Sequence, residues 1–337
     1  MAEELLRMQS ITNDKMDSTI HKAVDERYYP EYYTDSHRKY NFTAKDFDEI
    51  IENNEVIETK VVSYDDEKEE LIIDLGNTAY GVIPKDELEL SLIERKSTKP
   101  RAATFKTNKH IKVIVKSYEV SAGGRIKAVC SRKELQKECY DNYISKLVPG
   151  DVIIARVVNV TDYGIFCDIG CGITALLPIE YISVVNTFDL VENSKNLKKL
   201  LVVVKTNDNG KIVLSHKELL GTWKEEASQF EIDQEVIATV INIQDYGIFL
   251  RLSQNLSGLA DLTDEKFEVG DTVKAKIINI NENKMKIRLM ILSDKAEQIP
   301  VDLCNFEYKN KTDHIDEWVY STPGSTKHVM TSFAEEE

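Results

Sequence analysis

One five-residue stretch, Asp-Tyr-Gly-Ile-Phe, occurs twice in this chain of 337 residues, first at 162–166 and again at 245–249. A β-branched run precedes each copy, at 157–160 and at 240–243. Five identical residues after two similar runs indicate an internal repeat. Each copy places two aromatic residues around a glycine, beside a strand of alternating apolar residues. A sheet with that pattern can offer aromatic rings to nucleic-acid bases on one face and fill a barrel with the other.

Short apolar runs separated by turn residues follow in the same order within both copies. The upstream copy predicts strands over 152–160, 163–169, 175–179, 200–206 and 211–214, the last two joined by a turn at 207–210. The downstream copy predicts strands over 235–243, 246–252, 258–262, 272–280 and 285–290. Five short strands in each copy favour a small closed barrel over an open sheet.

A degenerate third copy lies upstream of these two. Aligning Leu-Gly at 75–76 with Ile-Gly at 169–170 places Pro84 on Pro178, because each proline falls eight residues after the glycine. The corresponding strands are expected over 55–63, 71–75, 80–83, 111–118 and 125–129. Glu69 and Ile72 stand where the other copies carry their aromatic residues. We therefore do not expect this copy to bind bases in the same way.

Short helices are expected between the barrels and before the first of them. The stretches 131–134 and 215–218 both read Ser-x-Lys-Glu, which fits the capping box of a helix N-terminus. Apolar stripes at helical spacing follow each box. They consist of Leu135, Cys139, Tyr143 and Leu147 after the first box, and of Leu219, Trp223 and Ala227 after the second. We expect Trp223 to pack between barrels rather than to bind a ligand, and a further helix over 44–52.

The predicted fold class is therefore all-β, with three tandem five-stranded OB-fold barrels joined by short helices and with irregular or partly helical termini. The expected organisation is an N-terminal extension over 1–51, a degenerate first repeat over 52–134, a second repeat over 146–220, a third repeat over 230–292 and an acidic C-terminal tail over 293–337. Weak patterning in both ends is compatible with partial disorder there.

The second repeat resembles a known motif. Its order is Gly-Asp-x-Ile, a β-branched strand, Tyr-Gly-Ile-Phe, Asp-Ile-Gly and finally Asn-Gly-Lys-Ile-x-Leu-Ser. This order resembles the S-one motif, an OB-fold repeat named after the largest protein of the bacterial small ribosomal subunit. The resemblance covers roughly 52–292 as three copies, and the joining stretches look like those of three-repeat members from Gram-positive bacteria. It implies a ribosomal-protein-like factor that binds single-stranded RNA, holds mRNA at the small ribosomal subunit in translation, and is not an enzyme.

The resemblance also implies which side chains contact RNA. The family uses two aromatic residues on its second strand and polar or basic residues at its last hairpin. Carried over by position, these are Tyr163, Phe166, Asn207 and Lys211 in the second repeat, and Tyr246, Phe249 and Lys286, with Asn281 or Glu282, in the third. A family histidine near the end of the third strand is absent, since Pro178 and Asp261 occupy its places. An acid at position 261 is expected to repel phosphate.

Strand periodicity leaves an alternative for the aromatic residues. Tyr163 and Phe166 differ by an odd number of positions, so both cannot point to one side of an unbroken strand. One or both could then simply fill the barrel. A bulge at the intervening glycine would instead bring both rings to the outer face.

The net charge of -15 argues at first against nucleic acid, but the charge is unevenly distributed. The stretch 95–118 contains no acid and many cations. We expect phosphate contact here, with a solvated face, or docking on an acidic protein or ribosomal RNA, as the alternatives. The candidate contacts are Arg95, Lys96, Lys99, Arg101, Lys106, Lys109 and Lys112.

The sequence shows no phosphate-binding Gly-x-x-x-x-Gly-Lys loop and no His-Glu-x-x-His zinc motif. No catalytic residues, cofactor or metal are therefore predicted, and the five cysteines are expected to be buried thiols. Without a signal sequence or an apolar span, the expectation is a cytoplasmic monomer with no membrane contact. Two alternatives to the ribosomal role stay open: an RNA chaperone or decay accessory protein off the ribosome, and a protein-interaction scaffold that has lost RNA binding.

Overall fold

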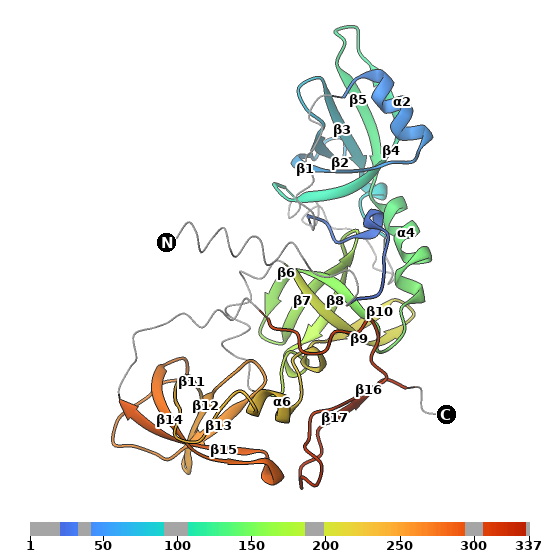
Figure 1. Cartoon of the computed structure of the whole chain (residues 1–337). Helices are drawn as coiled ribbons and strands as arrows, with labels where there is room; N and C mark the ends of the chain where they lie inside the picture. The colour runs from blue at the N-terminus through green and yellow to red at the C-terminus, as the bar shows by residue number, and fades with distance from the viewer. Residues whose placement is uncertain (1–20, 33–41, 91–106, 186–198, 294–305, 335–337) are drawn as a thin grey trace.

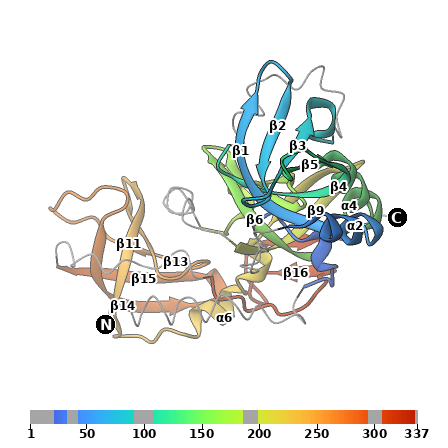
Figure 2. The same ribbon diagram turned by 90° about the horizontal axis from the view of Figure 1, so that it is seen from above.

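Three closed β-barrels follow one another along the chain (Figure 1), here described from a computed structural model. The structure describes residues 21–32, 42–90, 107–185, 199–293 and 306–334. The first barrel is stacked on the second, whereas the third lies to one side, as the perpendicular view also shows (Figure 2). The predicted fold class is confirmed.

Each barrel is built from five antiparallel-paired strands, closed by one parallel pairing between its third and fifth strands. The first barrel comprises β1 (Val56–Asp65), β2 (Glu70–Asp74), β3 (Ala79–Pro84), β4 (His110–Val120) and β5 (Ile126–Ser131). The second comprises β6 (Val152–Thr161), β7 (Gly164–Gly170), β8 (Ile173–Pro178), β9 (Lys199–Asp208) and β10 (Lys211–Ser215). The third comprises β11 (Glu235–Gln244), β12 (Gly247–Arg251), β13 (Ser257–Ala260), β14 (Thr272–Asn281) and β15 (Lys286–Ser293).

The strand register supports the alignment that defined the degenerate repeat. Pro84 lies opposite Glu70 in the first barrel, and Pro178 lies opposite Gly164 in the second. Both pairs are separated by 14 residues along the chain, so the two prolines occupy the same place in their barrels. The first repeat has therefore kept the barrel framework while changing the residues on it.

Alternating side chains fill each barrel, as period-two strands require. In β7, Ile165, Cys167 and Ile169 are buried in the second core. The helix α2 (Ala44–Glu52) lies where the sequence predicted it, begins with a capping box at Thr43, and packs Phe47 and Ile50 into the first core. The four cysteines in the described ranges are buried thiols that form no disulfide.

The linker helices follow the prediction only in part. α4 (Lys133–Asn142) presents Leu135, Cys139 and the following Tyr143 to the core of the second barrel, as expected. The second box begins only η6 (Lys217–Leu219), a single 3₁₀ turn. The chain then bends at Gly221, whose φ of 94° ends helical geometry, and α6 (Trp223–Ala227) starts with a capping box at Thr222 instead. The remaining 3₁₀ turns are η1 (Glu26–Tyr28), η2 (Lys85–Glu87), η3 (Ile144–Lys146), η4 (Ile179–Tyr181) and η7 (Glu282–Lys284).

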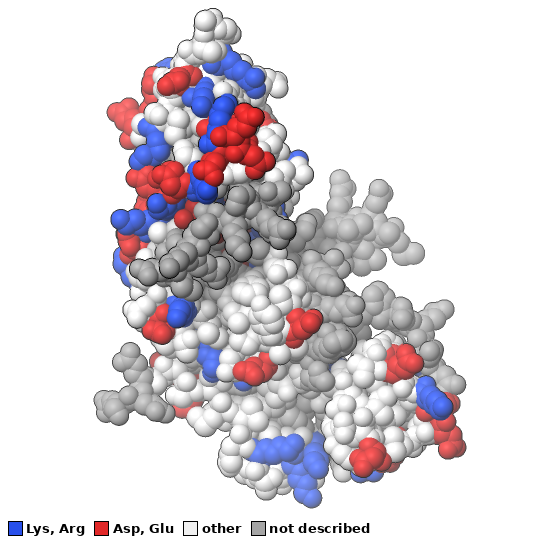
Figure 3. All heavy atoms as spheres, turned by 180° about the vertical axis from the view of Figure 1, so that it is seen from behind, with Lys and Arg blue, Asp and Glu red and all other residues white. Residues whose placement is uncertain are grey.

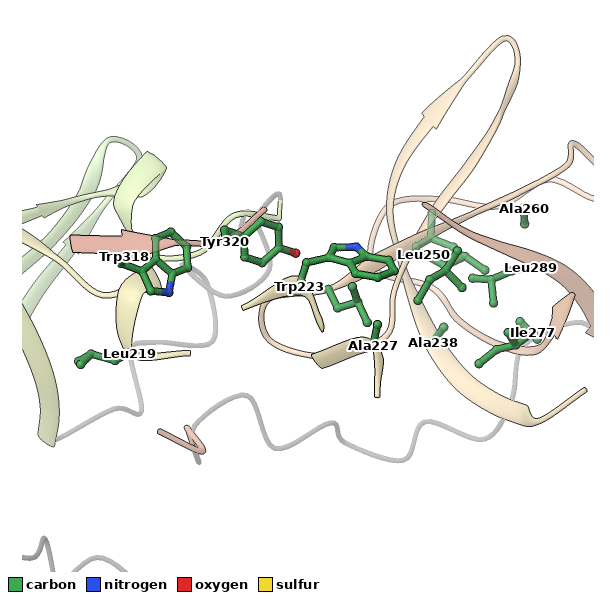
Figure 4. Packing of buried hydrophobic residues seen from close by; sticks show 14 of the residues in the cluster. Leu219, Trp223, Ala227, Ala238, Leu250, Ala260, Ile277, Leu289, Trp318 and Tyr320 are labelled. Atoms are coloured by element: carbon green, nitrogen blue, oxygen red, sulfur yellow. The ribbon is translucent and has the colours of Figure 1, made fainter. Parts of the chain in front are cut away.

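Much of the chain outside the barrels is ordered. Residues 21–32 run between the first two barrels, and residues 306–334 form the short hairpin of β16 (Glu317–Val319) and β17 (Met330–Ser332) beside the second barrel (Figure 1). Trp223 is buried between Tyr320 of this C-terminal segment and Leu250 of the third barrel (Figure 4). Trp223 therefore packs between barrels, as predicted, but with a C-terminal partner that the sequence did not indicate.

Candidate nucleic-acid interface

Two aromatic rings lie together on the outer face of the second barrel, and two more occupy the same position on the third. Tyr163 is 58% exposed, and its ring meets that of Phe166 edge to face at a centroid distance of 6.0 Å. Tyr246 is 63% exposed and meets Phe249 in the same way at 6.0 Å. Exposed tyrosines held at right angles to partly covered phenylalanines are surfaces on which bases can stack.

The backbone explains how both rings reach one side. Tyr163 belongs to the turn before β7 rather than to the strand, so strand parity does not apply to it. Gly164 follows with φ of 153°, and a Cβ there would lie 2.4 Å from the carbonyl oxygen of Leu177. Only glycine fits this approach without a shift. The bulge expected at the glycine is not found there, because the register is regular at Gly164; a bulge lies instead in the neighbouring strand, between Val157 and Asn159.

The hydrogen-bond register defines the row of side chains around each phenylalanine. Phe166 lies between Asn159 and Leu176, and Leu176 pairs in turn with Val213. In the third barrel the row reads Asn242, Phe249, Leu259, Arg288 and Asn279. An asparagine and a leucine therefore flank the ring in both barrels, while the third replaces an apolar residue by Arg288.

The first barrel lacks this surface, in line with its sequence. Ile72 takes the phenylalanine position between Ser63 and Val82. Glu69 takes the tyrosine position and forms an ion pair with Lys85. Charged residues of both signs are interspersed over this barrel (Figure 3). The aromatic pair of the other two barrels is therefore missing at the equivalent position, and the face seen in Figure 3 carries charges of both signs.

The predicted hairpin residues fall into two groups. Lys211 and Lys286 are exposed at the starts of β10 and β15, where they can reach a phosphate. The side-chain amide of Asn207 instead donates to the carbonyls of Leu147, at 2.9 Å, and Ile144. Asn281 caps η7 through its side chain, and Glu282 is exposed. The two lysines are thus the hairpin residues with free cationic ends.

The sequence reasoning missed a cationic group beside Tyr163. Lys205 and Lys217 lie over the ring of Tyr181, at 4.5 and 5.1 Å from its centre. The amide of Ile179, two residues before Tyr181, donates to the carbonyl of Tyr163, so this group lies at the tyrosine end of the platform. Burial lowers the pKa of Lys217. A β-bulge at Lys205 changes the side of the strand to which this lysine points. The alternating strand pattern does not reveal such a bulge, so the sequence did not indicate this group of cations.

Asp261, in the place of the family histidine, carries an ion pair. Its carboxylate lies 2.6 Å from the guanidinium of Arg288, and both side chains are exposed. The repulsion of phosphate expected from Asp261 is therefore offset by Arg288, which lies in the same row as Phe249.

The basic stretch is described only at its end. Arg95, Lys96, Lys99, Arg101 and Lys106 lie outside the described residues. Lys109 is exposed. Lys112 is only 6% exposed, because its ammonium group donates to the carbonyl of Glu26 at 3.0 Å. It is directed at the N-terminal segment, so we leave it out of the interface.

Other kinds of site find little support in the part of the chain that the structure describes. No group of three His, Cys, Asp or Glu residues there could hold a metal ion. Among the described helices, none is both long enough and apolar enough to cross a membrane.

Comparisons with known proteins agree with the barrel geometry. Residues 146–217 match the S1 RNA binding domain, which is the S-one motif. The chain is 26% identical to the small ribosomal subunit protein bS1 homolog of Bacillus subtilis, over 80% of this chain and 71% of that protein. It is 25% identical to small ribosomal subunit protein bS1 of Staphylococcus aureus, over 72% of this chain and 63% of that protein. A solved multidomain protein with nucleic acid binding domains from Streptococcus pneumoniae is 13% identical, covers 74% of this chain and 77% of its own, and gives a TM-score of 0.23, which is too low to bear on function.

Proposed function

Because this chain belongs to the family of S1-repeat RNA-binding proteins, we propose that its second and third barrels hold single-stranded RNA by base stacking and that it keeps mRNA near the small ribosomal subunit during translation. The proposal includes a cytoplasmic location and a monomeric state. It assigns no catalytic step to the protein.

The observation that carries the proposal is the repeated aromatic pair. Tyr163 with Phe166 and Tyr246 with Phe249 share one ring geometry on equivalent strands. Rings that only filled a barrel would be covered, yet both tyrosines are more than half exposed. Each stacked base contributes roughly 1–3 kcal/mol, so two pairs suffice for useful affinity without sequence readout.

Charge on the same faces suits a polyanion. Lys205 and Lys217 flank the tyrosine end of the second platform, and Arg288, which is paired with Asp261, extends the third. These cations are local, and at physiological salt the field beyond roughly 8 Å is screened. The net charge of -15 therefore does not prevent binding at these faces.

Fluorescence anisotropy of a labelled, unstructured oligouridylate at several salt concentrations tests the RNA-binding part. Two double variants are compared with wild type: Tyr163→Ala with Phe166→Ala, and Tyr246→Ala with Phe249→Ala. Each should weaken binding at least tenfold, while Tyr80→Ala, which removes a ring from the first barrel, should not. Wild type that shows no salt-dependent binding would favour the interaction-scaffold alternative.

Sedimentation of cell lysate tests the ribosomal part. If the protein works in translation, we expect it to co-sediment with small subunits, and RNase treatment should not abolish this co-sedimentation. Signal confined to the light fractions, together with RNA binding in vitro, would favour a chaperone or decay accessory role.

A further inference from the structure

A cavity of about 570 Å³ lies between the first two barrels, beside the aromatic platform of the second. Its walls come from three parts of the chain: Tyr32 of the N-terminal segment, Lys109 and His110 of the first barrel, and Arg156 and Thr174 of the second. It exists only because residues 21–32 cross between the barrels, so neither barrel alone would form it.

The cavity continues the outer face that carries Phe166. Arg156 pairs with Asp168, and Asp168 pairs with Thr174, in the row next to that of Asn159, Phe166 and Leu176. Two residues along a strand span roughly 7 Å, which is on the scale of one nucleotide unit. A strand of RNA stacked on Phe166 and extended toward barrel one would therefore reach the cavity with its next nucleotide.

Two cations of the cavity, Arg156 and Lys109, have no acidic partner among the described residues, whereas Arg132 is paired with Glu31 and Glu89. Arg156 places its guanidinium 5.2 Å from the ring centre of Tyr32, and its Nε is buried without a hydrogen-bond partner among the described residues. Lys109 is exposed, and no described carboxylate pairs with it or with Arg156. A buried N–H without an acceptor is costly, and a phosphate oxygen would supply that acceptor.

The acids of the cavity, by contrast, are already engaged. Both oxygens of Glu31 accept from the guanidinium of Arg132, and Glu89 lies 3.7 Å from the same guanidinium. The carboxyl group of Asp168 accepts backbone N–H groups of Glu31, Gly170 and Gly172. An incoming anion would therefore meet Arg156 and Lys109 rather than an unmatched carboxylate.

Tyr32 supplies a ring at the entrance. It is 39% exposed, touches His110 edge to face at 4.7 Å, and has φ of 59°, in the left-handed region that non-glycine residues rarely adopt. Strained backbone of this kind tends to be kept where a side chain has to be held for a ligand.

We propose that this cavity holds one nucleotide unit of the RNA strand that crosses the Tyr163–Phe166 platform, with its phosphate on Arg156 and Lys109 and its base against Tyr32. The inference rests on the proposed function and deepens it. The N-terminal segment thereby becomes part of the binding site, and the strand is oriented toward the first barrel.

The test uses the full chain and the labelled oligouridylate, with Lys109→Met, Arg156→Met and the charge-matched control Lys45→Met on the outer helix α2. Each cavity variant should weaken binding about three- to tenfold. Each should also reduce the slope of log affinity against log salt by about 0.7, the value for one lost phosphate contact on a single strand. Lys45→Met should change neither quantity. Circular dichroism checks folding, and the exposed Lys109 gives a result even if Arg156→Met is unstable.

The outcomes separate the cavity from the wider function. Unchanged affinity and slope in both cavity variants, with binding still lost in the Tyr163→Ala and Phe166→Ala double variant, would overturn the cavity proposal and leave RNA binding intact. Calorimetric titration with uridine monophosphate provides the other arm. If the protein binds this nucleotide through Lys109 but does not bind oligouridylate, the cavity is a site for a free nucleotide. The proposal that it holds part of an RNA strand would then be overturned. Binding of neither probe by wild type would overturn both proposals.

Discussion

The guanidinium of Arg132 donates two hydrogen bonds to the carboxylate of Glu31, from Nε to Oε1 at 2.6 Å and from Nη2 to Oε2 at 3.0 Å, and both side chains are buried. Glu31 also accepts from the amide of Lys112 in the first barrel, and its own amide donates to Asp168 in the second. One residue of the N-terminal segment thus connects both barrels, and Arg132 neutralises its charge at a buried position.

Glu31→Gln should loosen this junction, because it removes the carboxylate that binds the buried guanidinium of Arg132 through two hydrogen bonds and leaves only the longer contact with Glu89, at 3.7 Å. Removal of one member of a buried pair costs about 3–5 kcal/mol. Urea denaturation should show that loss, and limited proteolysis should cleave within residues 21–32 while the barrels stay folded. The exposed pair of Lys45 and Glu49 offers the control, since Lys45→Met should change stability by less than about 0.5 kcal/mol. Equal effects of the two substitutions would contradict the assigned role of Glu31.

The barrels could be predicted from the sequence, but this junction could not. Alternating apolar residues and a repeated turn mark each strand locally, and the offset that aligned Pro84 with Pro178 is reproduced by the strand register. Glu31 has no such local pattern. Arg132 was expected only as part of a capping box, although Ser131 does accept from the amide of Glu134. Ion pairs between segments a hundred residues apart leave no periodic trace in a sequence.

The same limit applied to the candidate site. The aromatic positions followed from the repeat and the family resemblance, whereas Tyr32 and Arg156 come together only through the path of the N-terminal segment. Lys112 was named as a candidate phosphate contact, but it is buried and donates to the carbonyl of Glu26, which its charge alone does not reveal. Partial disorder was expected of both ends, yet Trp318 and Tyr320 are buried in the described C-terminal segment.

Gly164→Ala should destabilise the second barrel far more than Gly123→Ala destabilises the first. An added Cβ at position 164 would meet the carbonyl oxygen of Leu177 at 2.4 Å, with φ of 153°. At Gly123 nothing lies within 4 Å of the added atom. Strain and overlap together should cost about 2 kcal/mol or more at Gly164. The free energy of unfolding of the Gly123 variant should lie within about 0.5 kcal/mol of the wild-type value. Thermal unfolding compares them, and similar melting temperatures for both variants would show that the turn tolerates a side chain.

Acid should weaken the packing of the C-terminal segment through His216. Burial lowers the pKa of His216 to about 4 from its ordinary value of 6.5, and its ring contacts Phe306 at 4.4 Å between centroids. The unfolded chain therefore takes up a proton between pH 6.5 and 4 that the folded protein resists. The contribution of neutral His216 to the free energy of unfolding is complete above pH 6.5. It is lost as the pH falls to about 4, and the loss amounts to at most roughly 3 kcal/mol.

His216→Phe should flatten that pH dependence, because phenylalanine fills the site without a titrating group. Urea unfolding of wild type and variant at pH 7.5 and pH 5 gives the comparison. The difference between the two pH values should be smaller by about 1–2 kcal/mol in the variant. An identical difference in both proteins would mean that folding does not lower the pKa of His216 and that other groups dominate the acid response.

Asp261→Asn should strengthen RNA binding by the third barrel. The carboxylate of Asp261 occupies Arg288 at 2.6 Å, and both are exposed, so its removal frees a cation in the row of Phe249 and deletes a charge that repels phosphate. Affinity for oligouridylate should rise about two- to fivefold at low salt. Stability should change by less than about 1 kcal/mol, as is usual for an exposed pair.

Glu119→Gln changes the net charge equally on the first barrel and should leave affinity unaltered. Weaker binding by Asp261→Asn would show instead that the acid holds Arg288 in the orientation that RNA requires. The double variant of Asp261→Asn with Tyr246→Ala would then lose no further affinity at this face.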